Sequence, residues 1–226
     1  MSSEERVVRT ILEKSGGLMI GGHFVLSDQK HTDRYVEKTR FLRRVDYLQI
    51  LADMIAKAYS KKNIEVVIAP AVGGVGLAAI VAVRMMQAGF GAAGEIQWGY
   101  AEPFRGKDGE LILYELKRGF AQMVEGKRVL VVEDVITTGR SAALVVKAVR
   151  ANGGNVVGLS AIINRGRVTS LDVGHPGYFK PLLTIDLPVF DPVDCELCKF
   201  NVPVNEELGH GKEFMAKQGL NINKVR

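Results

Sequence analysis

Residues 129–142 read VLVVEDVITTGRSA and join a strand signal to a helix signal through a short polar loop. Four consecutive branched aliphatic residues, 129–132, predict a buried strand. The acidic pair Glu133 and Asp134 follows, and then hydroxyl and glycine residues lead into a second apolar segment that predicts a helix at 141–151. A buried strand that passes through a glycine-bearing loop into a helix is the repeating unit of a parallel sheet.

The loop after this strand has the composition of a phosphate-binding site. Its residues are Thr137, Thr138, Gly139, Arg140 and Ser141. Backbone N–H groups at a helix start converge on an anion, and the helix dipole adds partial positive charge. Glu133 and Asp134 would repel a phosphate, but they would accept hydrogen bonds from paired hydroxyls, such as the 2- and 3-hydroxyls of a ribose. The alternative is a capped helix with two exposed acids. The sequence contains no G-x-x-x-x-G-K-[ST] motif, which argues against an ATPase or GTPase.

Outward from this unit, apolar strands and helices alternate along the chain. The expected elements are helices from Ser3 and from Asp46, strands at 66–69, 92–100 and 156–163, and a helix at 75–87. Such alternation is typical of an α/β fold with helices on both faces of a parallel sheet, in which ligands collect at the carboxyl ends of the strands. The loop APAVGGVG at 69–76 is therefore a second candidate for ligand binding.

Composition and charge limit the possible classes of protein. The chain has 226 residues, of which 47% are hydrophobic and 24% charged, as in an ordinary globular protein. Its net charge of +5 arises mainly in 1–62 and 105–128 without a long run of like charges, which favours a small anionic partner over nucleic acid. Residues 1–16 lack the apolar core of a signal peptide, and the apolar stretch 66–83 is interrupted by proline and glycine. We therefore expect neither secretion nor a membrane span.

The two cysteines form a lone C-x-x-C pair, Cys195 and Cys198. The pair supplies two of the four ligands that a structural zinc ion needs, and His210 could add a third. Two reduced thiols in a cytosolic protein are the expected state.

Several blocks of the sequence resemble one known family. Residues 131–142 resemble the binding signature for 5-phosphoribosyl 1-pyrophosphate (PRPP) in the type I phosphoribosyltransferases. More of the chain is similar to one branch, the orotate phosphoribosyltransferases, with blocks in the family's order. These blocks are FVLSDQKHTDRYVEKTRF at 24–41, APAVGGVGLAA at 69–79, LKRGF at 116–120, AIINRG at 161–166 and DPVDCELCKFNVP at 191–203.

The resemblance implies a fold and an activity. The fold would be that of the type I phosphoribosyltransferases, with a mainly parallel sheet flanked by helices. One domain would span 1–226, with a hood from about 1–44 and 180–226, a core at about 45–179 and a mobile loop at 101–118. The activity would be transfer of the 5-phosphoribosyl group from PRPP to orotate, which gives orotidine 5-phosphate and pyrophosphate in UMP biosynthesis. A cytoplasmic homodimer is implied, with Mg²⁺ carried by PRPP rather than by protein side chains, and without nucleic acid or membrane partners.

The family's functional residues carry over to matching positions. The implied PRPP-binding residues are Glu133, Asp134, Thr137, Thr138, Gly139, Arg140, Ser141, Gly73, Gly74, Lys117 and Arg118. The implied orotate-binding residues are Thr137, Arg165, Tyr35 and Lys38. The implied catalytic residues are Asp134, Arg105 and Lys107, the last two on the mobile loop that closes over the pyrophosphate of a neighbouring subunit.

The sequence departs from the family pattern at three places. Ser27 stands where many orotate enzymes have a substrate-binding lysine, so that Lys38 or Lys30 would have to replace it. The mobile loop lacks an adjacent Arg-Lys pair, because Gly106 separates its two cations. Gly73 occupies a position that is lysine in many members.

Three alternatives remain open at this point. Gly74, Gly76 and Ala79 match the G-x-G-x-x-A fingerprint of dinucleotide-binding oxidoreductases. Glu95 would be the acidic residue of that fingerprint, but this interpretation leaves the loop at 137–141 unexplained. The second alternative is a regulator that senses PRPP without catalysis. It would need a DNA-reading module, but the block at 24–41 that resembles the orotate enzymes occupies most of the segment where such a module could lie. The same chemistry on a purine or another pyrimidine is the third alternative.

Overall fold

The computed structural model describes residues 2–26, 28–91 and 95–222, which form two compact units. Met1–Thr10 and Leu42–Ile185 form the first, here named the core unit, and Ile11–Phe41 and Asp186–Arg226 form the second, the terminal unit. Ser27 lies outside the described residues. The single domain with its hood therefore stays a prediction.

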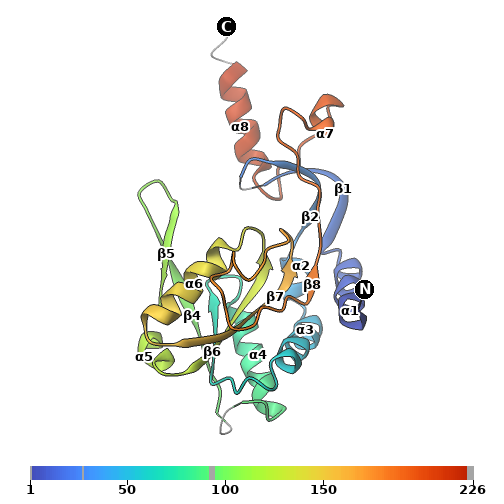
Figure 1. The fold of residues 1–226 in the computed structure, drawn as a ribbon. Helices are drawn as coiled ribbons and strands as arrows, with labels where there is room; N and C mark the ends of the chain where they lie inside the picture. The colour runs from blue at the N-terminus through green and yellow to red at the C-terminus, as the bar shows by residue number, and fades with distance from the viewer. Residues whose placement is uncertain (1, 27, 92–94, 223–226) are drawn as a thin grey trace. The chain divides into compact units, whose positions relative to one another are not determined.

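A six-stranded sheet with the order β5-β4-β3-β6-β7-β8 forms the centre of the core unit (Figure 1). The strands are β3 (Val66–Pro70), β4 (Gln97–Arg105), β5 (Leu111–Glu115), β6 (Arg128–Ile136), β7 (Asn155–Asn164) and β8 (Leu183–Thr184). All neighbouring strands run parallel except β4 and β5, which form an antiparallel hairpin. The predicted α/β fold with a mainly parallel sheet is confirmed.

Helices cover both faces of this sheet. They are α3 (Val45–Ala58), α4 (Val75–Gln87), α5 (Phe120–Val124) and α6 (Arg140–Ala151). The crossover through α4 leads from β3 outward to β4, and the crossover through α6 leads from β6 outward in the opposite direction to β7. Because such crossovers are right-handed, the two helices lie on opposite faces. The apolar run of β6 serves both faces: Val129 and Val131 pack in the cluster that contains α6, whereas Leu130 is equally buried but lies outside that cluster.

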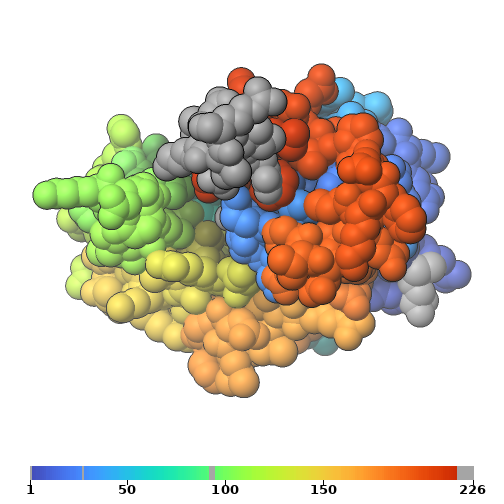
Figure 2. Space-filling model, turned by 90° about the horizontal axis from the view of Figure 1, so that it is seen from above, coloured from blue at the N-terminus to red at the C-terminus, as the bar shows by residue number. Residues whose placement is uncertain are grey.

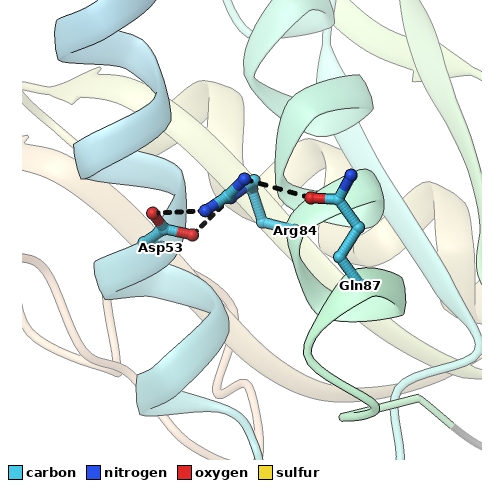
Figure 3. Close-up of polar contacts among 3 residues, drawn as sticks. All are labelled: Asp53, Arg84 and Gln87. Atoms are coloured by element: carbon cyan, nitrogen blue, oxygen red, sulfur yellow. Dashed lines mark hydrogen bonds and ion pairs between the residues drawn. The ribbon is translucent and has the colours of Figure 1, made fainter.

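An ion pair links α3 to α4 on the surface of the core unit (Figure 3). The Arg84 guanidinium donates two hydrogen bonds to the Asp53 carboxylate, with Nη2 2.8 Å from Oδ2, and Nη1 donates to Gln87 Oε1 at 3.0 Å. The pair joins the two helices at the surface. Because both side chains are partly exposed to solvent, it contributes little to the stability of the fold.

Two strands differ in extent from the sequence prediction. β4 begins at Gln97 and continues to Arg105, whereas the sequence predicted a strand at 92–100, of which 92–94 lie outside the described residues. β6 continues through the acidic pair to Ile136, because its pairing with β7 extends from Arg128 to that residue. In the apolar stretch 66–83 the structure has β3 and most of α4, and none of the helices in the described ranges is long and apolar enough to cross a membrane.

The segment 101–118 contains an antiparallel hairpin. β4 and β5 pair from Glu102 opposite Glu115 to Arg105 opposite Leu111, and residues 106–110 form the turn. This hairpin, light green in Figure 2, stands out from the rest of the core unit. It is the segment that the family resemblance assigns to the mobile loop, and its mobility stays a prediction.

The terminal unit contains an antiparallel pair, β1 (Leu18–Val25) and β2 (His31–Val36), and two C-terminal helices, α7 (Glu196–Lys199) and α8 (Gly211–Ile222). The remaining helices are α1 (Ser3–Ser15) and α2 (Thr39–Leu42), each of which crosses a boundary between the units. The C-terminal segment pairs with the β1–β2 hairpin. The backbone N–H groups of His31 and Phe190 each donate to the other residue's carbonyl at 2.8 Å. Distant parts of the sequence therefore form one unit.

Candidate active site

The candidate site lies where the two crossovers of the core unit diverge. β3 and β6 are direct neighbours, in register from Val66 opposite Val129 to Ile68 opposite Val131. In open α/β sheets, ligands bind at this point, beyond the carboxyl ends of the strands. The loops at 71–74 and 137–139 leave the sheet there, and they are the two loops that the sequence predicted to bind a ligand.

The acidic pair lies within the end of β6 and is buried. Glu133 is 8% exposed and Asp134 is 1% exposed, so the alternative of two exposed acids is wrong. Asp134 Oδ1 accepts a hydrogen bond from the Val135 N–H at 2.6 Å, and Glu133 Oε1 accepts one from the Asp134 N–H at 3.3 Å. Burial of a carboxylate costs free energy unless polar groups face it. Carboxylate oxygens can each accept more than one hydrogen bond, so the pair is suited to polar hydrogens such as those of sugar hydroxyls.

The loop after β6 forms a helix N-terminus that is open to solvent. Gly139 precedes α6 in the left-handed conformation, with φ +80°. A Cβ atom at this position would lie 2.8 Å from the backbone oxygen of Asp172, so that only glycine fits. Thr137 and Thr138 are exposed, and the N-terminus of the twelve-residue helix follows them. This geometry matches the predicted phosphate cradle.

Pairing between β6 and β7 places the predicted base-binding residues of the core unit side by side. The Arg165 N–H donates to the Ile136 carbonyl at 2.8 Å, directly before Thr137. Gly166 lies so close to this loop that a Cβ atom on it would be 1.8 Å from the Thr137 carbonyl oxygen. The structure thus brings Thr137 and Arg165 together at the carboxyl edge of the sheet.

The glycine loop after β3 lies against the neighbouring strand. A Cβ atom on Gly74 would lie 2.8 Å from the Ala69 Cβ and 3.4 Å from the Val132 carbonyl oxygen in β6. Gly74 is buried, whereas Gly73 is exposed. The predicted pyrophosphate loop therefore packs tightly beside the strand that carries the acidic pair.

The predicted pyrophosphate cations all lie on or beside the β4–β5 hairpin. Arg105, Lys107, Lys117 and Arg118 are exposed. Two of them form ion pairs, Lys117 with Glu115 at 2.9 Å and Arg118 with Glu102 at 2.8 Å, and Arg105 donates to the Gly109 carbonyl at 3.0 Å. Substrate binding would have to compete with these contacts.

The cradle also contacts two hairpin residues that the sequence did not single out, Leu111 and Tyr114. The Arg140 side chain donates to the Leu111 carbonyl at 2.6 Å. Tyr114 is buried near Ser141, and burial raises the pKa of its hydroxyl, with nearby Glu133 acting in the same direction. Residues 111–115 read LILYE, an apolar run that does not indicate which of its side chains points inward.

Two of the predicted orotate-binding residues belong to the terminal unit. Tyr35 lies on β2, with its ring stacked on Phe24 at 5.3 Å between centroids, and the half-buried Lys38 follows that strand. A shared role with Thr137 and Arg165 stays a prediction, because those residues belong to the core unit.

The chain matches a known protein family. A family model described as the phosphoribosyl transferase domain matches residues 40–177, more than half of the chain. Among solved structures, orotate phosphoribosyltransferase from Aeropyrum pernix is similar with a TM-score of 0.61 and 26% identity, over 79% of this chain and 93% of that one.

Curated relatives specify the branch of the family. An orotate phosphoribosyltransferase from Thermotoga maritima is 38% identical over 91% of this chain and 99% of its own length. Another, from Caldanaerobacter subterraneus, is 33% identical over 81% of this chain and 86% of its own. The chain therefore belongs to the orotate phosphoribosyltransferases, which confirms the family resemblance and sets aside a dinucleotide-binding oxidoreductase.

Proposed function

We propose that this protein transfers the 5-phosphoribosyl group of PRPP to orotate, giving orotidine 5-phosphate and pyrophosphate. The main support is the joint position of the helix N-terminal cradle and the buried acidic pair at the divergence of the crossovers. The cradle would hold the 5-phosphate on its backbone N–H groups, while Glu133 and Asp134 would accept hydrogen bonds from the ribose hydroxyls. A solved orotate phosphoribosyltransferase from Mycobacterium tuberculosis was obtained in complex with PRPP, and it shares this fold with a TM-score of 0.57.

The arrangement contains candidate residues for binding both the pyrophosphate of PRPP and the orotate base. The Gly73–Gly74 loop would accommodate the pyrophosphate, and Arg165 would pair with the carboxylate of orotate beside Thr137. Bond cleavage at C1 develops positive charge on the sugar and negative charge on the departing pyrophosphate. The protein therefore acts mainly by positioning the reactants and by stabilising charge. Arg105 and Lys107, exposed on the hairpin, are suited to approach the leaving group.

Magnesium fits this site as an ion bound chiefly by the substrate. Carboxylate oxygens suit Mg²⁺, and Glu133 and Asp134 offer them at the end of β6. Within the described residues, however, no group of three or more acidic side chains converges there, so that PRPP oxygens and water would supply most of the ligands. Bound there, Mg²⁺ would neutralise part of the negative charge on the pyrophosphate.

A spectrophotometric assay with purified protein tests the proposal. With PRPP, Mg²⁺ and orotate, we expect loss of orotate absorbance and release of pyrophosphate. Parallel reactions contain uracil, adenine or hypoxanthine. Turnover with one of these bases but not with orotate would overturn the choice of substrate. Tight PRPP binding by calorimetry without turnover of any base would instead indicate a PRPP-sensing regulator.

We further propose that the protein is a cytoplasmic homodimer in which the hairpin of one subunit covers the pyrophosphate of the other. Lys107→Gln should then lower kcat/KM for PRPP by about tenfold to a hundredfold, because one cation near the leaving group is lost. Lys127→Gln is the matched control, since Lys127 precedes β6 at the opposite end of the sheet and should leave the rate unchanged.

A mixing experiment tests whether subunits share the site. Lys107→Gln and Asp134→Asn proteins are refolded together, so that mixed dimers carry one site without either change. We expect activity to rise above that of both separate variants. If light scattering shows a monomer, or if mixing restores no activity, the shared site is contradicted.

A further inference from the structure

Four side chains with metal-binding atoms converge inside the terminal unit: His23, His31, Cys195 and Cys198. Their ligand atoms all lie within 4.8 Å of one another. His31 and Cys195 are fully buried, and His23 is 2% exposed. The histidines come from the β1–β2 hairpin, and the cysteines come from the segment that enters α7, more than 150 residues later (Figure 1).

The distances between these atoms are those of a tetrahedral site. The two nitrogens that face each other, His23 Nε2 and His31 Nδ1, are 2.9 Å apart. Cys198 Sγ lies 3.3 Å from the His31 nitrogen and 3.8 Å from the His23 nitrogen, and Cys195 Sγ lies 3.8 Å from the latter. With zinc–nitrogen bonds of about 2.0–2.1 Å and zinc–sulfur bonds of about 2.3 Å, a tetrahedron has edges of roughly 3.3–3.8 Å. The observed distances need only small shifts to reach these values.

The surroundings orient one imidazole for metal binding. His23 Nδ1 lies 2.8 Å from the Val202 carbonyl oxygen, which can only accept a hydrogen bond. The proton of a neutral His23 therefore belongs on Nδ1, and the lone pair of Nε2 points into the cluster. Metal-binding histidines in proteins commonly have such a carbonyl partner on the second nitrogen.

The backbone also holds the two halves of the cluster together. The Asn205 N–H donates to the His23 carbonyl at 2.8 Å, and the reciprocal bonds between His31 and Phe190 fix the other histidine. The cysteines lie in a tight turn in which the Lys199 N–H donates to the Cys195 carbonyl at 3.2 Å. The ligand positions are thus set by hydrogen-bonded backbone rather than by flexible loops.

We propose that His23, His31, Cys195 and Cys198 bind one Zn²⁺ ion with a structural role. Two cysteines and two histidines are a common ligand set for structural zinc, and four protein ligands leave no position for a substrate or a reactive water. The ion would cross-link the β1–β2 hairpin to the C-terminal segment. A two-stranded sheet is only marginally stable by itself, and small units of this kind often depend on a metal ion. The sequence suggested His210 as a third ligand, but this residue is exposed and lies 4.0 Å from Glu213.

Metal analysis of the full chain, purified under reducing conditions without added chelator, tests the site. We expect about one zinc ion per chain, and we expect Co²⁺ titration of the stripped protein to give visible bands of tetrahedral cobalt and a near-ultraviolet thiolate charge-transfer band. Because the chain has only two cysteines, a thiol reagent should modify two groups in the stripped protein and should react much more slowly after zinc is added back.

Variants with single substitutions distinguish zinc bound at this site from adventitious metal. His31→Gln and Cys198→Ser should lose the zinc and the cobalt spectrum. His175→Gln and His210→Gln, the remaining two histidines of the chain, should keep both. If His31→Gln or Cys198→Ser misfolds, the cobalt and thiol measurements still test the site, because they use the unmodified sequence. The proposal is overturned if the wild-type chain with intact thiols takes up no zinc, or if its cobalt spectrum lacks the thiolate band.

Discussion

Asp134→Asn is expected to lower kcat by at least about a hundredfold while the protein stays folded. The replacement keeps the size of a side chain that is 1% exposed and accepts the Val135 N–H through Oδ1. It removes the negative charge that would face the ribose as positive charge develops on the sugar. The measurement is a steady-state rate with saturating PRPP and orotate, together with a thermal unfolding curve.

The control for this variant is Asp53→Asn in the same unit. Asp53 lies on α3 in a partly exposed pair with Arg84, so that its loss should leave the rate unchanged and the unfolding temperature nearly so. An Asp134→Asn protein with the wild-type rate would contradict the role proposed for this carboxylate. Equal loss of rate in both variants would show that the effect is not specific to the site.

Gly139→Ala is expected to weaken PRPP binding at least about tenfold and to destabilise the protein. The left-handed backbone at Gly139 disfavours any residue with a Cβ by about 1–2 kcal/mol. The added methyl group would also lie 2.8 Å from the Asp172 oxygen and 3.0 Å from a methyl of Val168, and the loop would have to move away. Since this loop supplies the proposed phosphate-binding N–H groups, its displacement should raise the Kd for PRPP, as measured by calorimetry.

Gly126→Ala separates backbone strain from this steric effect. Gly126 has a φ of +69°, close to that of Gly139, but a Cβ atom there would meet nothing within 4 Å. Its replacement should therefore destabilise the protein by about 1–2 kcal/mol and leave PRPP affinity unchanged. If Gly139→Ala binds PRPP as tightly as Gly126→Ala does, the 5-phosphate does not lie in the cradle.

The core of the fold was predictable because its signals are local. The valine-rich runs at 66–69 and 129–132 are buried on both faces of a parallel sheet, and such strands consist almost wholly of apolar residues. The helix at 75–87 has its predicted bounds. The end of β6 was missed, because Glu133 and Asp134 are polar residues in a strand. Only the pairing with β7, a non-local interaction, continues the strand through them.

The same difference between local and non-local signals decides which parts of the sites could be predicted. The cradle was predicted because Thr137, Thr138 and Gly139 are consecutive and have a local physical meaning. The burial of Tyr114 beside the cradle depends on how the hairpin packs, which no spacing in the sequence reveals. For a similar reason, the sequence indicated the two cysteines as possible zinc ligands but not the two histidines that lie beside them. His23 and His31 have no recognisable spacing relative to Cys195, and only the folded terminal unit brings them together.

The divergence of the crossovers also has a consequence for the order of folding. The segments β3-α4-β4 and β6-α6-β7 are each contiguous in sequence, and each carries one loop of the site. Contacts within a segment close short loops, whereas the pairing of Val66 with Val129 joins residues far apart in the chain and costs more loop-closure entropy. A folding intermediate that contains only the two separate segments would have both loops but no binding site. At the proposed site, PRPP would therefore stabilise the chain only after β3 and β6 have paired.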